Sequence, residues 1–110
     1  MADLLTQRRA ARETRIDVDG HTWTLRRPTA YERIGLSGLT PLEILCRFVT
    51  GWTLTGIDLV PGGDPSPIPF DADLASDYLA DTPSLWEPLT QALGDAIKAH
   101  DDALEAAAKN

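Results

Sequence analysis

Few residues of this chain have the types and the spacing that catalysis or metal binding needs. The chain contains two histidines, His21 and His100, and one cysteine, Cys46. His100 has Ala96 four residues before it rather than a second histidine, so this segment lacks the ligand pair that a helix presents to zinc. We expect His21 to be a structural neighbour across two strands, and Cys46 to be a buried small hydrophobe rather than a reactive thiol.

Aspartates recur at short steps in one segment, a pattern that is compatible with calcium binding. They are Asp71, Asp73, Asp77 and Asp81. A calcium loop also needs a central glycine and a terminal bidentate glutamate, which this segment lacks, so we expect a solvated helix face. The chain also lacks a phosphate-binding loop and the Gly-x-Ser-x-Gly motif of a nucleophilic serine. The sequence therefore predicts a protein that is not an enzyme, with no catalytic residue, no cofactor and no metal.

The charge is divided unevenly along the chain. The formal net charge is -7; residues 1–50 contain eight arginines against six acidic residues, and residues 51–110 contain two lysines against eleven acidic residues. The acidic half repels phosphate backbones, so we expect no nucleic-acid partner, although the arginine-rich start can still contact a phosphate. No apolar run approaches the ~20 residues of a membrane span, and the first residues lack a secretory pattern. This predicts a cytoplasmic protein with no membrane partner.

The length predicts one domain over residues 1–110. Residues 1–12 are expected to form a helical arm that is mobile when no partner covers it, because they contain few apolar residues. Residues 13–110 then form the folded body.

The clearest local element is a β-hairpin. Asp19-Gly20 has the composition of a two-residue type I′ turn, and the flanking residues alternate between apolar and polar. This pattern predicts strands over about 13–26, with Ile16 opposite Trp23 and one apolar face that helices must cover. Trp23 and Trp52 are expected in the core, because aromatic side chains dominate the burial of small domains.

Three segments have the form of a capping box, in which a hydroxyl residue and a glutamate three positions later bond each other's backbone at a helix start. The pairs are Thr29 with Glu32, Thr40 with Glu43, and Ser84 with Glu87. The second of these helices, about 41–50, is expected to be the central buried helix. Asp71 is placed to cap a further helix that runs to about Leu79.

Residues 53–70 are rich in proline and glycine, so they predict a loop or a short second hairpin. In such a hairpin, one strand would contain Ile57 and Leu59, and the other would run from Ile68 to Phe70. With the first hairpin, the helices predict an α+β fold that is mainly helical, with the N-terminal hairpin packed on about four helices.

The last helix has an apolar arc that is wider than one contact needs. One row recurs every four residues and consists of Leu85, Leu89, Leu93 and Ile97. With the neighbouring rows, the excess predicts a partner-binding surface formed by Trp86, Leu89, Leu93, Ile97 and Leu104. The alternative for Trp86 is to pack back onto Tyr78 across the turn at 80–84.

Taken in order, these features resemble the tail assembly chaperones of long-tailed bacteriophages. The resemblance spans about residues 13–100 and rests on the order and spacing of its motifs rather than on a single signature. The motifs are Ile16-x-Val-x-Gly20, Trp23-Thr-Leu-Arg-Arg-Pro-Thr29, Gly51-Trp52, Gly56-Ile57-Asp58, Pro67-Ile-Pro-Phe70 and Leu79-x-x-x-Pro83-x-Leu-Trp86. The long Pro-Gly segment at 61–69 departs from the leaner turn expected of the family, so no partner contact is assigned to it.

The resemblance implies a non-enzymatic protein of the host cytoplasm that is absent from the mature virion. Such chaperones bind the tape measure protein, keep it soluble and help to recruit tail tube protein. Many are made in two lengths by a ribosomal frameshift, so the resemblance implies that this chain is the short form and that its partners include the long form and second copies of itself. Lys109-Asn110 can be encoded by AAA-AAC, which is compatible with a slippery site.

Other functions stay open at this point. One is a structural tail or head adaptor that is retained in the particle, which would bury a broad apolar surface permanently. Another is an acidic inhibitor or DNA mimic, which would need its acidic residues gathered on one face. The acidic residues of this chain are instead spread over two expected helices and the loops.

Overall fold

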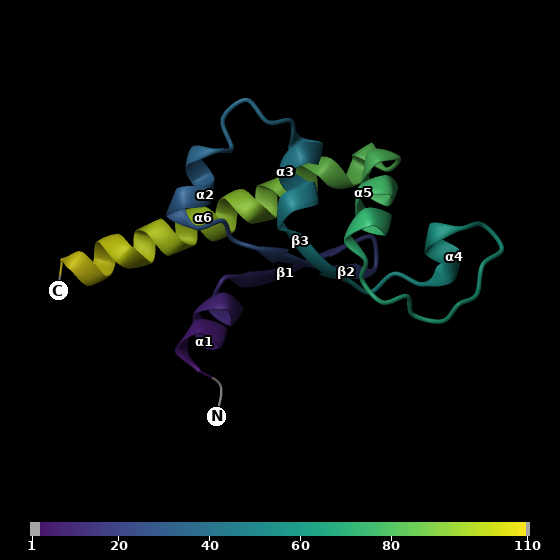
Figure 1. The fold of residues 1–110 in the computed structure, drawn as a ribbon, viewed down its shortest axis with the longest axis horizontal. Helices are drawn as coiled ribbons and strands as arrows, with labels where there is room; N and C mark the ends of the chain where they lie inside the picture. Colours follow the sequence, from purple (N-terminus) through teal and green to yellow (C-terminus); the bar gives the residue numbers. More distant parts are fainter. Residues whose placement is uncertain (1–2, 110) are drawn as a thin grey trace.

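The computed structural model describes residues 3–109 and has a mixed α+β fold that is mainly helical, with 56% helix and 17% strand. This confirms the predicted fold class. The described residues form 6 helices, a 3-10 turn and one three-stranded antiparallel sheet in the order β1-β2-β3 (Figure 1).

The helices are α1 (Leu4–Ala11), α2 (Ala30–Ile34), α3 (Pro41–Phe48), α4 (Gly56–Leu59), α5 (Ala72–Ala80) and α6 (Trp86–Ala108), and the 3-10 turn is η1 (Pro83–Leu85). The strands are β1 (Glu13–Val18), β2 (His21–Arg26) and β3 (Val49–Trp52). The helical arm is present over α1, where none of the residues is buried. Residues 1 and 2 of the expected arm, and Asn110, lie outside the described residues.

The predicted hairpin is confirmed, with its register. Strands β1 and β2 pair antiparallel with Ile16 opposite Trp23, and Asp19 and Gly20 have the positive φ angles of 52° and 82° that a type I′ turn requires. Trp23 is buried on the face that the helices cover. A shift of one residue in this pairing would turn that face to solvent, so the turn and the alternation specify the same register.

Strand β3 was not predicted, because residues 41–50 were expected to be helical. Helix α3 ends at Phe48, and Val49–Trp52 pair antiparallel with β2, with an irregularity in the register between Thr24 and Leu25. A β-carbon added to Gly51 would lie only 3.1 Å from the Thr24 side chain. Glycine therefore permits the close approach of the two strands at this position.

Two of the three predicted capping boxes are present, at the starts of α2 and α3. The third, Ser84 with Glu87, is wrong. Helix α6 begins at Trp86 without a side-chain cap, and the preceding residues form η1, in which the N–H of Leu85 donates to the Thr82 carbonyl at 3.1 Å. The tight turn of η1 places Leu85 in the core, where its side chain is 4% exposed.

The expected second hairpin at 53–70 is also wrong, and the loop interpretation holds. The segment contains the single turn of α4 and one isolated bridge between Thr55 and Pro67. A β-carbon on Gly56 would lie 2.5 Å from the carbonyl oxygen of Asp64, so the backbones of the first and second halves of the loop are in direct contact. The indole N–H of Trp52 holds the second half in place by donating to the Ile68 carbonyl at 2.8 Å.

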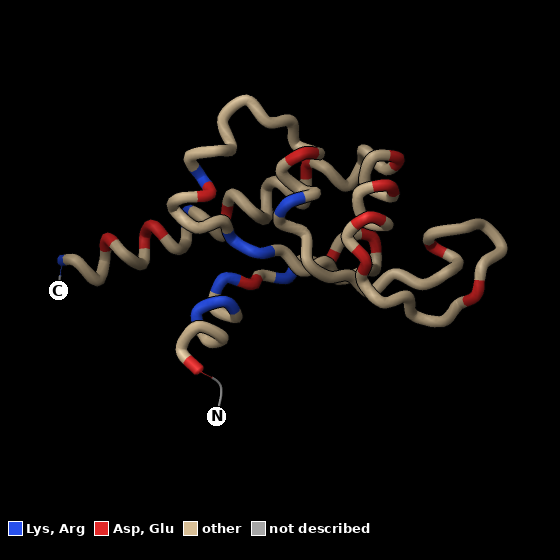
Figure 2. Tube along the Cα trace, in the orientation of Figure 1, with Lys and Arg blue, Asp and Glu red and all other residues tan. Residues whose placement is uncertain are grey.

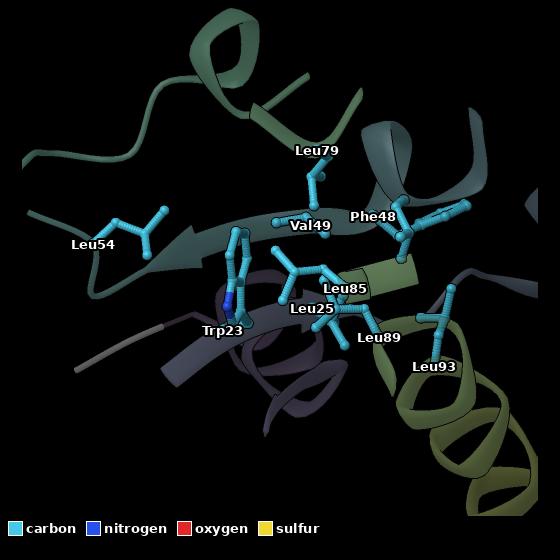
Figure 3. Packing of buried hydrophobic residues seen from close by; sticks show 10 residues of the cluster. Trp23, Leu25, Phe48, Val49, Leu54, Leu79, Leu85, Leu89 and Leu93 are labelled. Atoms are coloured by element: carbon cyan, nitrogen blue, oxygen red, sulfur yellow. The ribbon is translucent and has the colours of Figure 1, made fainter. Parts of the chain in front are cut away.

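The core lies between the sheet and helices α3, α5 and α6 (Figure 3). Trp23 is fully buried in it, edge-on to Trp52 at 6.0 Å and stacked with Tyr78 at 6.3 Å between ring centroids. The prediction for Trp23 is confirmed, and Trp52 is partly buried against the same cluster. The remaining buried members of the cluster are Leu25, Leu45, Phe48, Val49, Leu54, Leu79, Leu85, Leu89 and Leu93.

Candidate functional site

The predicted partner-binding stripe of α6 divides into a buried part and an exposed part. Leu89 is 0% exposed and Leu93 is 3% exposed, and Ile97 is partly buried against the same core. These residues cover the apolar face of the hairpin, which two strands cannot shield alone. The expected surface is therefore corrected, since Leu89 and Leu93 are not accessible to a partner in this conformation.

Trp86 turns back toward α5 across the turn at 80–84, as the alternative interpretation expected, rather than facing a partner. Its indole N–H donates to the carbonyl of Leu79 at 2.7 Å, so the ring is held against the end of α5. It stays only partly buried. The indole N–H is therefore satisfied within the chain and needs no acceptor from a partner protein.

Leu104 lies on the part of α6 that extends beyond the core. The helix has 23 residues, which corresponds to about 35 Å, and its C-terminal end projects past the sheet (Figure 1). Residues 102–109 are all exposed, and Leu104 is 57% exposed. This member of the predicted stripe is available to a partner.

A second exposed apolar group belongs to α2 and was not predicted. Tyr31 is 84% exposed and Ile34 is 79% exposed, and they line a hollow of about 320 Å³ whose floor includes Gly35 and Phe48. The sequence signal was present, because α2 is too short to bury both its faces between Thr29 and Gly35.

An ion pair connects α2 to the projecting end of α6. One guanidinium nitrogen of Arg33 lies 3.1 Å and 3.2 Å from the two carboxylate oxygens of Asp101. Leu104 is one turn beyond Asp101 on the same side of α6. This ion pair joins α2, which carries Tyr31 and Ile34, to the turn of α6 that precedes Leu104. The three exposed residues Tyr31, Ile34 and Leu104 are together called the α2–α6 surface below.

Glu32 fixes α2 in place under this surface. Its carboxylate accepts hydrogen bonds from Arg26 at 2.7 Å and from the Thr29 N–H at 3.0 Å. The bond from Arg26 and then that from Thr29 lower the pKa of Glu32 from 4.5 to about 2. The Arg26 guanidinium also lies 4.8 Å from the centre of the Phe48 ring, so the start of α2 is joined to the core.

His21 forms a pair with an acidic residue that the sequence did not indicate. Its Nε2 lies 3.1 Å from a carboxylate oxygen of Asp58, whose other oxygen accepts from the N–H and the hydroxyl of Thr55. The Thr55 N–H is the main reason that the pKa of Asp58 lies below its ordinary value, and His21 contributes less. The pair joins α4 to the hairpin, where His21 is a cross-strand neighbour, as predicted, and lies opposite Val18.

The other residues considered for chemistry are dispersed. Cys46 is exposed, so its predicted burial is wrong: α3 directs Leu45 and Phe48 into the core and leaves Cys46 on the outer side. The α5 aspartates, Asp73 and Asp77, are exposed, as a solvated face requires. Over residues 3–109, no group of three or more metal-ligating side chains comes together. Within the same range, every helix is too short or too polar to span a bilayer.

Comparisons of this chain with protein-family models, with curated proteins and with solved structures found no match. The chain therefore has a mixed α+β fold with exposed apolar residues on two helices. A proposal for its function rests on the order of its sequence motifs and on the α2–α6 surface.

Proposed function

We propose that this chain is the short form of a tail assembly chaperone of a long-tailed bacteriophage. In this proposal it binds and solubilises the tape measure protein and helps to recruit tail tube protein, without catalysis. It acts in the host cytoplasm and is absent from the mature virion. The ordered motifs over about residues 13–100 support the assignment to this class.

The observation that carries the proposal is the α2–α6 surface. Its three members are large apolar side chains at 57% to 84% exposure, which the apolar positions of a partner helix can cover. The projecting end of α6 also contains alanines, which let a second helix approach closely. A long helical protein such as the tape measure protein fits such a surface, because its own apolar positions need to be covered until assembly.

The charge distribution supports a protective role. The net charge of -7 includes exposed carboxylates on α5 and on the last turns of α6 (Figure 2). Like-charged complexes repel one another, so a tape measure protein coated with this chain would resist aggregation. In the same proposal, a longer frameshifted form would continue from the end of α6, and the two forms and further copies would coat one partner.

The test is co-expression of the chain with the long helical protein encoded downstream, followed by affinity pull-down and a measurement of soluble yield. Replacing the surface residues by glutamine, in Tyr31→Gln/Ile34→Gln and in Leu104→Gln, is expected to weaken recovery of the complex about tenfold or more. Ile57→Gln is the matched control, because Ile57 is 49% exposed on α4, outside the surface. It is expected to leave recovery unchanged.

Two results would contradict the proposal. One is the absence of a complex when both proteins are present. The other is the presence of this chain in purified particles, which would favour a structural adaptor. Circular dichroism of each variant shows that a loss of binding does not come from unfolding.

A further inference from the structure

Two arginines face each other where the hairpin meets α1. The N–H of Arg27 donates to the carbonyl of Arg12 at 2.7 Å, which extends the β1–β2 ladder one step beyond the pair of Glu13 and Arg26. Arg12 and Arg27 are therefore cross-strand neighbours. Like charges at opposed positions destabilise a hairpin, so this arrangement opposes folding unless something else compensates for it.

The two arginines line a hollow of about 330 Å³ between the hairpin and α6. The far wall is formed by α6, where Ala96 and Ala99 leave room because their side chains are short. The remaining lining residues are Ala11, Glu13, Thr14 and His100. This hollow is separate from the one under Tyr31 and Ile34.

The two guanidinium groups are only partly satisfied by the described part of the chain, in which one nitrogen of Arg27 donates to the Pro28 carbonyl at 3.3 Å. The Nε of Arg12 is buried and has no hydrogen-bond partner among residues 3–109. Partial burial, and then the charge of Arg12, lower the pKa of the Arg27 guanidinium. Arg33 and Arg8 act in the same direction, and Asp101 opposes them. A buried donor beside mutually repelling cations is a binding arrangement for an anion.

We propose that this hollow binds a carboxylate side chain from an acidic segment of a protein partner, held between Arg12 and Arg27. The inference does not rest on the chaperone function, because it concerns a different surface.

Three observations favour a protein carboxylate over a phosphate chain. Glu13 lines the hollow, and its carboxylate lies next to it, 4.0 Å from the Arg15 guanidinium, where its negative charge disfavours a multiply charged anion. Leu4 is 75% exposed and Leu5 is 53% exposed on the adjoining α1, and apolar side chains of a protein segment can cover them. Most of the arginines also lie on α1, on the hairpin and beside them, whereas acidic residues are spread over α5, α6 and the loop at 53–70 and would repel a nucleic acid that extends past the hollow (Figure 2).

The test uses a synthetic peptide of Glu, Leu and Ser with about ten residues, which span about 33 Å when extended. It is titrated into the full chain while the arginine Nε–Hε resonances are followed by NMR. Saturable binding is expected, with the Arg12 Nε–Hε resonance among those that shift most. A peptide with Gln at each Glu position is expected to cause no such shift.

Charge-neutralising variants locate the site. Arg12→Gln and Arg27→Gln are each expected to weaken the binding of the Glu peptide about tenfold, the size of a lost charge-assisted hydrogen bond. Arg47→Gln removes the same charge from an exposed position on α3 outside this hollow, and it is expected to change the affinity less than about twofold.

Several results would overturn the proposal. They are absence of binding by the Glu peptide, equal binding of the Gln peptide, and equal losses in Arg47→Gln and Arg12→Gln. An oligothymidylate of equal charge is the phosphate arm, and tighter arginine-dependent binding of it would assign the hollow to nucleic acid. Self-association of the chain that Arg12→Gln abolishes would assign it to a second copy.

Discussion

Glu32 is a single residue whose charge stabilises the start of α2. Its pKa of about 2 in the folded chain lies below the ordinary value of 4.5, so its ionised form stabilises the fold at pH values above 4.5. That contribution is lost as the pH falls from 4.5 through 2.

Glu32→Gln is expected to lower the free energy of unfolding by about 1 kcal/mol at pH 7, because glutamine keeps an acceptor oxygen but loses the charge. Urea titrations at a series of pH values check this, and the difference from the wild type should shrink between pH 4.5 and 2. The control is Glu87→Gln at an exposed position. A difference that stays constant with pH would show that the charge of Glu32 has no role.

Two glycines offer a matched comparison at the same scale. A β-carbon on Gly56 would lie 2.5 Å from the backbone oxygen of Asp64, whereas a β-carbon on Gly94 would meet nothing within 4 Å. Gly56→Ala is expected to lower the free energy of unfolding by about 1–3 kcal/mol, because the backbone must move. Gly94→Ala is expected to raise it by about 0.5–1 kcal/mol, because alanine is the better helix former. Thermal melts of both variants check the prediction, and equal signs would contradict it.

Helix α6 combines two roles along one element. Leu93 is 3% exposed and Leu104 is 57% exposed, although both belong to the same apolar arc of the sequence. Leu93→Gln is expected to lower the free energy of unfolding by about 3–5 kcal/mol, because it buries a polar group and removes core packing. Leu104→Gln is expected to stay within about 0.5 kcal/mol of the wild type. Chemical denaturation checks both, and comparable losses would show that the end of α6 packs against the core.

The sequence predicted those elements whose signals are local. The hairpin was predictable because the Asp19-Gly20 turn and the alternation of apolar residues indicate the same register. Helices α2 and α3 were predictable because both of their capping boxes are present in the structure. Strand β3 was missed because it is short, contains Gly51 and exists only through its pairing with β2.

The candidate site was less predictable, because exposure depends on tertiary packing. The periodicity of α6 identifies an apolar arc but does not show how far the core extends along it. Leu104 was correctly placed on that arc, but Leu89 and Leu93 are buried within the chain. The exposure of Tyr31 and Ile34 follows from the tertiary position of α2, which the ion pair of Arg33 with Asp101 joins to α6.

At the scale of the whole molecule, the chain is elongated. The Cα radius of gyration is 15.6 Å with extents of 56 × 39 × 22 Å, against about 13 Å for a compact domain of this length. Small-angle X-ray scattering of the monomer is expected to give a radius of gyration well above 13 Å, because the end of α6 projects into solvent. A value near 13 Å would show that α6 bends back onto the body.

The division of α6 also has a consequence for its local dynamics. Its first turns are held by the core, whereas the turns after Ile97 depend on helix propensity and on exposed ion pairs. These join Arg33 with Asp101, Lys98 with Asp102, and Lys109 with Glu105. Short unsupported helix ends fray, so amide hydrogens there should exchange with solvent much faster than those around Leu89. The binding free energy of a partner that covers this end would have to offset the conformational entropy that is lost when the end is ordered. The slowing of exchange in these turns would then report occupancy of the helix without any label or mutation.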